Sequence, residues 1–178
     1  MVRQWLDSEK VIDQIQDSGN YISVELGVQT VNPAKIIGLS RKLEDKDLKY
    51  LRQKIKNEGW RDIEPRGIGL ILLPQEDKFI VYYGGNHRAI ICNELSIAEI
   101  KAHVTAYIDK RKMNLKENII IQARKSQVHK LYKAMRKHKD ITKRTEIGIK
   151  VGRIEEELEE YKREVYLRIK NTRNVHLT

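Results

Sequence analysis

Apolar residues follow two different periods along this chain. Between residues 20 and 109 they alternate with polar residues or form short runs, which is typical of β-strands with a few helices between them. Beyond residue 110 they recur every three or four residues, which is typical of long amphipathic helices. The pattern predicts three parts: an N-terminal helix within residues 1–19, a small domain over 20–109 and a helical region over 110–178.

The first two parts are expected to alternate helices and strands. Ile22, Val24, Leu26 and Val28 would share one side of a strand, and Gly59 would end a helix. The expected helices and strands predict an α+β fold with a small mixed sheet followed by a helical C-terminal region. The expected elements are helix 8–16, strand 21–28, helix 45–57, strand 68–73, strand 79–83, a helix after residue 86 and strand 100–108.

The C-terminal region is expected to contain two helices separated by a break within residues 140–148. The second helix, over 151–169, has a heptad-like apolar stripe that suits packing on the first helix or, in a homodimer, on a second copy of the chain. A helix-turn-helix around residues 146–152 is an alternative, although its second helix would be acidic and would repel phosphates. The first helix is expected to bury one stripe: Leu115, Ile119, Ala123, Val128, Leu131 and Met135.

Positive charge is concentrated in one segment. The chain carries 35 Lys and Arg against 25 Asp and Glu, a net charge of +10. Residues 110–145 contain 13 Lys and Arg against two acids, Glu117 and Asp140. Since neutralising phosphates releases counterions, DNA is the expected partner. A solvated helix face, an acidic protein partner, or neutralisation by the chain's own acidic helix are alternatives. The candidate DNA-contacting residues are Arg124, Lys125, Lys130, Lys133, Arg136 and Lys137.

Several classes of protein are disfavoured by the composition. No apolar run approaches the 20 or so residues that span a bilayer, and the first residues lack the apolar core of a signal peptide. A cytoplasmic location is therefore expected. The single cysteine, Cys92, excludes an internal disulfide and a cysteine-rich zinc site, and a buried structural thiol is expected there. No metal site is predicted from the protein's own residues.

The segment that carries the most chemical information follows Tyr83 and reads Gly84, Gly85, Asn86, His87, Arg88. A strand is expected to stop at the glycines and a helix to begin, which leaves the first helical N–H groups without internal partners and open to an anion. Arg88 offers a fork of donors for phosphate, and His87 can act as an acid or base. The alternative is a plain glycine turn with a surface ion pair and a structural histidine.

The order of these elements, together with the residues Asn32-Pro33, Gly59, Pro65 and the 84–88 turn, resembles the ParB/sulfiredoxin superfamily over residues 21–108. The resemblance implies that the turn holds nucleotide phosphates, those of ATP or CTP, often with Mg²⁺. It also implies supporting roles for Ser40 and Arg41 at the phosphates. Some family kinases keep a catalytic acid where this chain has Glu64, which could act as a base or hold Mg²⁺.

Two departures from the family limit the function. Sulfiredoxins have their nucleophilic cysteine where this chain has Asn86, so peroxiredoxin repair is not expected. Partition proteins carry a Glu-Asn-x-x-Arg motif, and here Glu117-Asn118 is followed by Ile121 at the arginine position. The expected function is a DNA-binding ParB-like protein of partition or mobile-element type. Alternatives are a nucleotide hydrolase, small-molecule kinase or nuclease using His87, Arg88 and Glu64, or an interaction protein whose turn has lost its ligand.

Overall fold

The computed structural model describes residues 4–59, 61, 67–74 and 76–175. The chain forms two compact units, Met1–Tyr107 and Ile108–Thr178. The first is built on a six-stranded sheet and the second is helical. This architecture confirms the predicted α+β class, with a mixed sheet followed by a helical C-terminal region.

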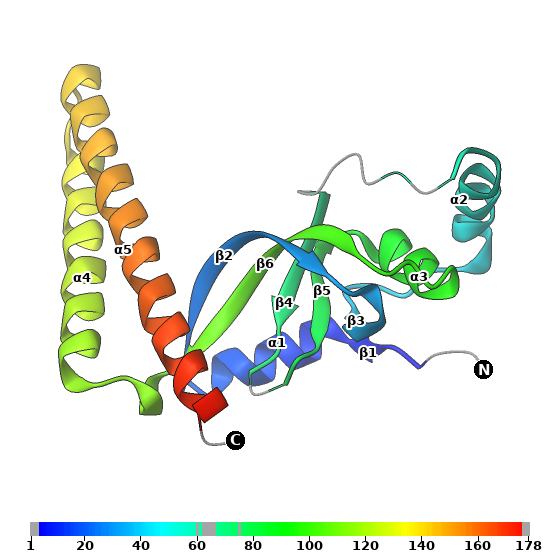
Figure 1. The fold of residues 1–178 in the computed structure, drawn as a ribbon. Helices are drawn as coiled ribbons and strands as arrows, with labels where there is room; N and C mark the ends of the chain where they lie inside the picture. The colour runs from blue at the N-terminus through cyan, green and yellow to red at the C-terminus, as the bar shows by residue number, and fades with distance from the viewer. Residues whose placement is uncertain (1–3, 60, 62–66, 75, 176–178) are drawn as a thin grey trace. The chain divides into compact units, whose positions relative to one another are not determined.

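The sheet has the strand order β1-β3-β5-β4-β6-β2 (Figure 1). The pairs β1–β3, β3–β5 and β4–β6 are parallel, whereas β4–β5 is antiparallel. The elements in chain order are β1 (Leu6–Asp7), α1 (Ser8–Asp17), β2 (Tyr21–Val31), β3 (Ile36–Leu39), α2 (Asp45–Glu58), β4 (Ile68–Leu72), β5 (Phe79–Gly84), α3 (Asn86–Glu94) and β6 (Ile100–Asp109).

Helices cover both faces of this sheet. Val81 of β5 packs with Ala89 of α3 on one face. The preceding residue, Ile80, packs with Ile12 of α1 on the other face, because consecutive side chains of a strand point to opposite sides. The sheet therefore lies between α3 and α1, and β5 contributes to both cores before it enters the glycine turn.

The predicted helix over 45–57 and its glycine stop are confirmed by α2. Gly59 has a φ of +78° and its N–H donates to the Ile55 carbonyl at 2.8 Å, as expected of a glycine that closes a helix. Arg52 of α2 then makes a forked ion pair with Glu94 of α3, at 2.7 and 2.8 Å. This pair attaches α2 to the helix that follows the glycine turn.

The N-terminal strands differ from the prediction. β2 continues to Val31, and Val28 is exposed instead of sharing the buried side with Ile22. The reason is Gly27, whose φ of +71° interrupts the alternation. β1 and β3, which have two and four residues, were not predicted, because such short strands leave almost no periodic signal.

The second unit is a helical hairpin. After a single 3₁₀ turn at Lys110–Lys112, α4 (Leu115–Lys137) and α5 (Ile141–Val175) lie side by side (Figure 1). Asp140 caps α5, since its Oδ1 accepts from Thr142 N at 2.8 Å. The helices run antiparallel: Glu117, near the start of α4, is paired with Arg168, near the end of α5.

The predicted break between the two helices is confirmed at Asp140, since α4 ends at Lys137 and α5 begins at Ile141. The break does not extend toward Gly148, because α5 runs through residues 141–148. Gly148 and Gly152 lie inside this helix, where their cost of about 1 kcal/mol each is offset by packing. Gly148 faces Met135 of α4, and a Cβ there would be 3.9 Å from its sulfur. A continuous α5 also rules out the alternative of a helix-turn-helix around residues 146–152.

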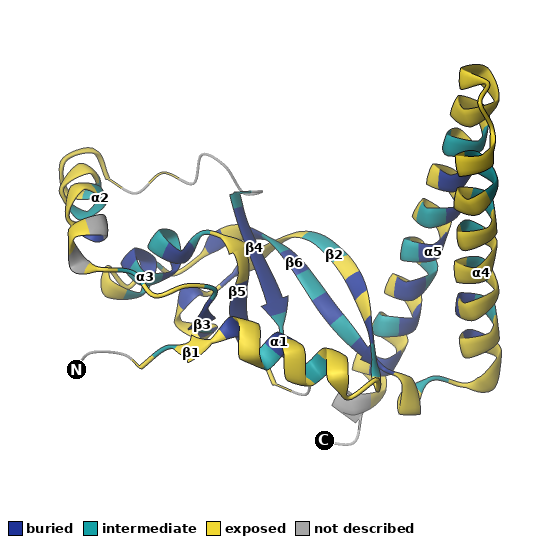
Figure 2. Ribbon diagram, turned by 180° about the vertical axis from the view of Figure 1, so that it is seen from behind, coloured by how far each residue is buried: buried dark blue, intermediate teal, exposed yellow. Residues whose placement is uncertain are grey.

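The predicted buried stripe of α4 is wrong in its first half. Leu115 and Ile119 are 76% and 58% exposed, and Glu117 and Ile121 take the buried positions instead. The side facing α5 continues through the half-buried Val128, Leu131 and Met135. The rest of α4 is exposed along most of its length (Figure 2). Among the described residues, no helix combines the length and apolar content needed to cross a membrane.

Candidate phosphate-binding turn and nucleic-acid interface

The turn between β5 and α3 has the geometry that its sequence predicts. Gly84 and Gly85 have φ values of +57° and +68°, and Gly85 is the N-cap of α3 in the left-handed conformation. No side chain in the described part of the chain caps this helix. The first N–H groups of α3 therefore have no helical partner and lie at its positive end, an arrangement that favours an anion.

The two glycines are also required by the fold itself. A Cβ on Gly84 would lie 2.5 Å from the Gly67 carbonyl oxygen, and one on Gly85 would lie 2.4 Å from Cγ1 of Ile68. Both contacts are too close for any side chain. The glycines therefore secure the shape of the turn, and the case for an anion depends on the uncapped amides and the side chains around them.

Ser40 and Asn86 meet at this turn although 46 residues separate them. Ser40 N donates to Asn86 Oδ1 at 3.0 Å, and Asn86 Nδ2 donates to Ser40 Oγ at 2.9 Å. Asn86 is 5% exposed. Its amide is therefore occupied in joining the loop after β3 to the start of α3. This contact also brings the backbone of the exposed Arg41 next to the turn.

The remaining predicted site residues differ in their surroundings. His87 and Arg88 are half-buried on the first turn of α3, and Arg88 already takes part in an interaction within the chain. Glu64 lies outside the described residues. The structure thus brings Ser40, Arg41 and residues 84–88 to one corner. Cys92, one helical turn further on, is fully buried.

The basic residues of the hairpin fall into two groups. Arg124, in the middle of α4, pairs with Glu157 of α5 at 2.9 Å. The pKa of Lys125 is lowered, first by burial and then by repulsion from Lys162 and Lys110. The predicted residues nearer the turn are exposed and have no ion-pair partner in the part of the chain that the structure describes: Lys130, Lys133, Arg136 and Lys137.

Three further cations, which the sequence did not single out, belong to the same end of the hairpin. Lys139, Lys143 and Arg144 follow α4 through the turn and into the first turns of α5, and all three are exposed. Together with the four exposed α4 residues they place seven cations and one acid, Asp140, within residues 130–144. We call residues 130–144 the basic tip. The break predicted within residues 140–148 concealed the tip, because residues outside a helix would not extend the charged helix surface.

Acidic residues of α5 neutralise the middle of the hairpin, between the exposed cations of residues 110–116 and those of the tip. Besides the Glu157–Arg124 pair, Glu155 accepts a hydrogen bond from the Tyr132 hydroxyl at 3.2 Å, which raises the pKa of Tyr132. Glu159 pairs with the buried Lys162. The expectation that acidic and basic helices neutralise each other therefore holds for the middle of the hairpin. The run of glutamates reaches the tip at Tyr132 and Glu155, but among the described residues no ion pair joins it to a cation of the tip.

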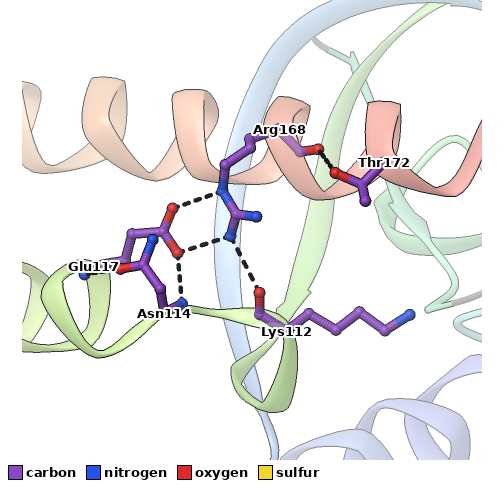
Figure 3. Close-up of polar contacts among 5 residues, drawn as sticks. All are labelled: Lys112, Asn114, Glu117, Arg168 and Thr172. Carbon is purple, nitrogen blue, oxygen red and sulfur yellow. Dashed lines mark hydrogen bonds and ion pairs between the residues drawn. The ribbon is translucent and has the colours of Figure 1, made fainter. Parts of the chain in front are cut away.

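Glu117 has a structural role at the opposite end of the hairpin (Figure 3). Its carboxylate accepts from Asn114 N at 2.9 Å in a capping box, and from Arg168 Nε and Nη2 at 2.7 and 2.8 Å. Arg168 Nη2 also donates to the Lys112 carbonyl at 3.1 Å. Glu117 is 7% exposed, and its carboxylate is thus occupied in fastening α5 to the start of α4.

Metal ligation by the protein's own side chains has no candidate site among the described residues, which hold no group of three or more His, Cys, Asp or Glu suited to a cation. Comparison of the chain with models of known protein families, with curated proteins and with solved structures returned no match.

Proposed function

We propose that this chain binds DNA through the basic tip of its helical hairpin. The observation that carries this proposal is the set of seven exposed cations within residues 130–144, against one acid. Lys130, Lys133 and Lys137 recur at i, i+3 and i+7, so they form a stripe on α4. This stripe lies opposite the side chains that pack on α5. A rigid rod of like charges at this spacing suits the regular phosphates of a nucleic-acid backbone.

The first experiment reverses charge at the tip in the full-length chain. The variant Lys133→Glu, Arg136→Glu, Lys137→Glu should bind a duplex oligonucleotide at least tenfold more weakly at low salt, because three phosphate contacts become repulsive. Fluorescence anisotropy would measure the affinity. The matched control, Lys49→Glu, Lys54→Glu, Lys56→Glu, makes the same change in net charge on α2. Equal loss in both variants, or loss in neither, would contradict a contact at the tip.

We further propose that the β5–α3 turn binds the phosphates of a nucleotide, as the ParB/sulfiredoxin resemblance implies. Support comes from the uncapped start of α3 and from the Ser40–Asn86 contact that brings Arg41 beside it. ATP and CTP are the candidate ligands, with Mg²⁺ bound through their phosphates. A ParB-like protein of partition or mobile-element type would combine such a site with DNA binding. His87 is then the residue placed to act as an acid or base in a nucleotide hydrolase, kinase or nuclease.

A thermal-shift screen of ATP, ADP, CTP and GTP with Mg²⁺ tests the turn. One of these nucleotides should raise the unfolding temperature, because a ligand that binds only the folded state stabilises it. The increase should be lost in Arg41→Ala and in Arg88→Ala. Lys42→Ala, which removes a neighbouring exposed cation, is the control. A nucleotide effect that survives in both arginine variants would place the ligand elsewhere.

A further inference from the structure

Two tyrosines at the end of β5 point to the same face of the sheet. Gly69 of β4 pairs with Tyr83, whereas the next residue, Leu70, pairs with Val81, so Tyr82 is an extra residue in β5. Consecutive strand residues normally face opposite sides, and a bulge of this kind changes that alternation. The tyrosine rings consequently lie edge to face, with centroids 5.7 Å apart and planes at 72°.

The two rings are held in place yet remain accessible. The Tyr83 ring lies over Gly69, where a Cβ would be 2.2 Å from its Cε1. Even so, Tyr82 and Tyr83 are 52% and 45% exposed. A structural role explains why a tyrosine stands at position 83, because its ring covers a glycine of the sheet. No such role explains Tyr82, which is 52% exposed.

An imidazole extends this aromatic surface across the sheet. His103 of β6 pairs with Gly69 on the side away from Tyr83, so Tyr83, Gly69 and His103 form one row over three strands. Glu25 of β2 lies 3.4 Å from His103 Nδ1 and accepts from the Thr105 hydroxyl at 3.3 Å. The His103 ring is thus oriented by a carboxylate. We call Tyr82, Tyr83 and His103 the aromatic row.

We propose that the aromatic row binds the bases of single-stranded nucleic acid by stacking. Rings exposed on a β-sheet face are suited to unpaired bases, because every base presents a π-face on which an aromatic ring can stack. Charges of both signs lie around the row, because the half-exposed carboxylate of Glu25 contacts His103. Tyr83 leads directly into the glycine turn with its uncapped helix start, and Lys101 lies two residues before His103 on β6.

This inference goes beyond the proposed DNA contact, because it uses the sheet unit and unpaired bases, whereas the basic tip would contact phosphates of any nucleic acid. The two are separable by chemistry. Stacking requires bases and is indifferent to the duplex backbone, so an oligonucleotide without bases should lose the stacking contribution and keep the phosphate contribution.

The experiment compares two single-stranded 12-mers with the same number of phosphates, oligo-dT and an abasic strand, on the full-length protein. Oligo-dT should bind about fivefold or more tightly than the abasic strand. Tyr82→Ala should reduce this ratio severalfold, and Tyr82→Phe should keep it, since the ring is retained. Tyr50→Ala, which removes a tyrosine that is 76% exposed on α2, is the matched control. Anisotropy measures the affinity of both strands for the unaltered protein and for each of the three variants.

Tyr82 is chosen because Tyr83 also covers Gly69, so replacing Tyr83 could unfold the sheet. Quenching of 2-aminopurine placed in the oligonucleotide gives a second readout that reports stacking directly. Equal binding of the two strands by the unaltered protein would overturn the proposal, as would a ratio that Tyr82→Ala leaves unchanged. The proposal would also be overturned if thymidine monophosphate displaced the 12-mer completely and bound with the same affinity. The row would then be a site for a mononucleotide. Charge reversal at the basic tip should weaken the binding of both strands equally and leave their ratio unchanged. A failure of the proposed DNA contact at the tip can therefore be told apart from a failure of the stacking proposal.

Discussion

The carboxylate of Asp109, the last residue of β6, shows how one buried charge is stabilised by its neighbours. Asp109 is 5% exposed. Its oxygens accept from Arg111 Nε at 2.9 Å, from Arg111 Nη2 at 2.8 Å and from Arg111 N at 3.0 Å. The side-chain hydrogen bond of Arg111 is the main reason that the pKa of Asp109 is lowered, and it outweighs the opposing effect of burial. These bonds fix the 3₁₀ turn that begins the hairpin unit.

A lowered pKa makes the contribution of Asp109 depend on pH in one direction. Because the folded state favours the charged form, the stabilisation is complete above the unfolded pKa of 3.8 and is lost as pH falls through the lower folded pKa. Asp109→Asn should therefore reduce the free energy of unfolding by about 1 kcal/mol at pH 7, and the difference from the unaltered protein should shrink below pH 4. Urea unfolding of both proteins at pH 7 and at pH 3 measures this difference in the free energy of unfolding. A difference of the same size at both pH values would refute the stabilising role of the Asp109 carboxylate.

At the scale of elements, the hairpin is fastened at one end by polar contacts and along its length by apolar ones. Glu117 joins the capping box of α4 to Arg168 of α5. Between there and the basic tip, Val151, Leu158 and Val165 of α5 are buried, and their spacing of seven residues is that of a coiled-coil seam. The apolar seam stabilises the pairing, whereas the Glu117–Arg168 contact selects which residues lie opposite each other.

Removing Arg168 should loosen this end of the hairpin. Arg168→Ala leaves Glu117, which is 7% exposed, without its forked partner, and we expect a loss of about 1–2 kcal/mol in the free energy of unfolding. Amide exchange should increase most over the first turns of α4 and the last turns of α5. Arg153→Ala, which removes an exposed arginine from the same helix, should change neither quantity by a comparable amount. Protection that is unchanged near Glu117 would show that the ion pair does not fasten the helices.

The sequence was informative wherever a local pattern determines structure, and it failed where residues far apart decide it. The glycines that open α3 and the one that ends α2 were predictable, because a positive φ favours glycine at the position itself. The Ser40–Asn86 contact was not, since nothing in either segment indicates the other. Likewise, the pairing of Arg124 with Glu157 depends on the antiparallel hairpin. Helical periodicity alone could not show this pair, so Arg124 was predicted to be a DNA-contacting residue.

At the scale of the whole molecule, the distribution of charge matters more than its total. The net charge is +10, but residues 1–109 and 146–178 are close to neutral and residues 110–145 carry the excess. Pairing within the hairpin then neutralises part of that positive charge, at Arg124. The basic tip holds seven of the 13 cations of this segment, and a smaller exposed group lies within residues 110–116. The number of phosphates that the tip neutralises should be limited by its seven cations.

The salt dependence of binding measures that number. Each neutralised phosphate contributes about −0.9 to the slope of log K against log salt on duplex DNA, so contacts by four to seven tip residues predict a slope of roughly −4 to −6. Reversing Lys133, Arg136 and Lys137 to Glu should reduce its magnitude by about 3, and the α2 control should leave it unchanged. If the tip variant lost affinity but kept the full slope, the phosphates would be neutralised elsewhere on the chain. The lost affinity would then reflect a changed hairpin, because only groups that displace counterions enter the slope.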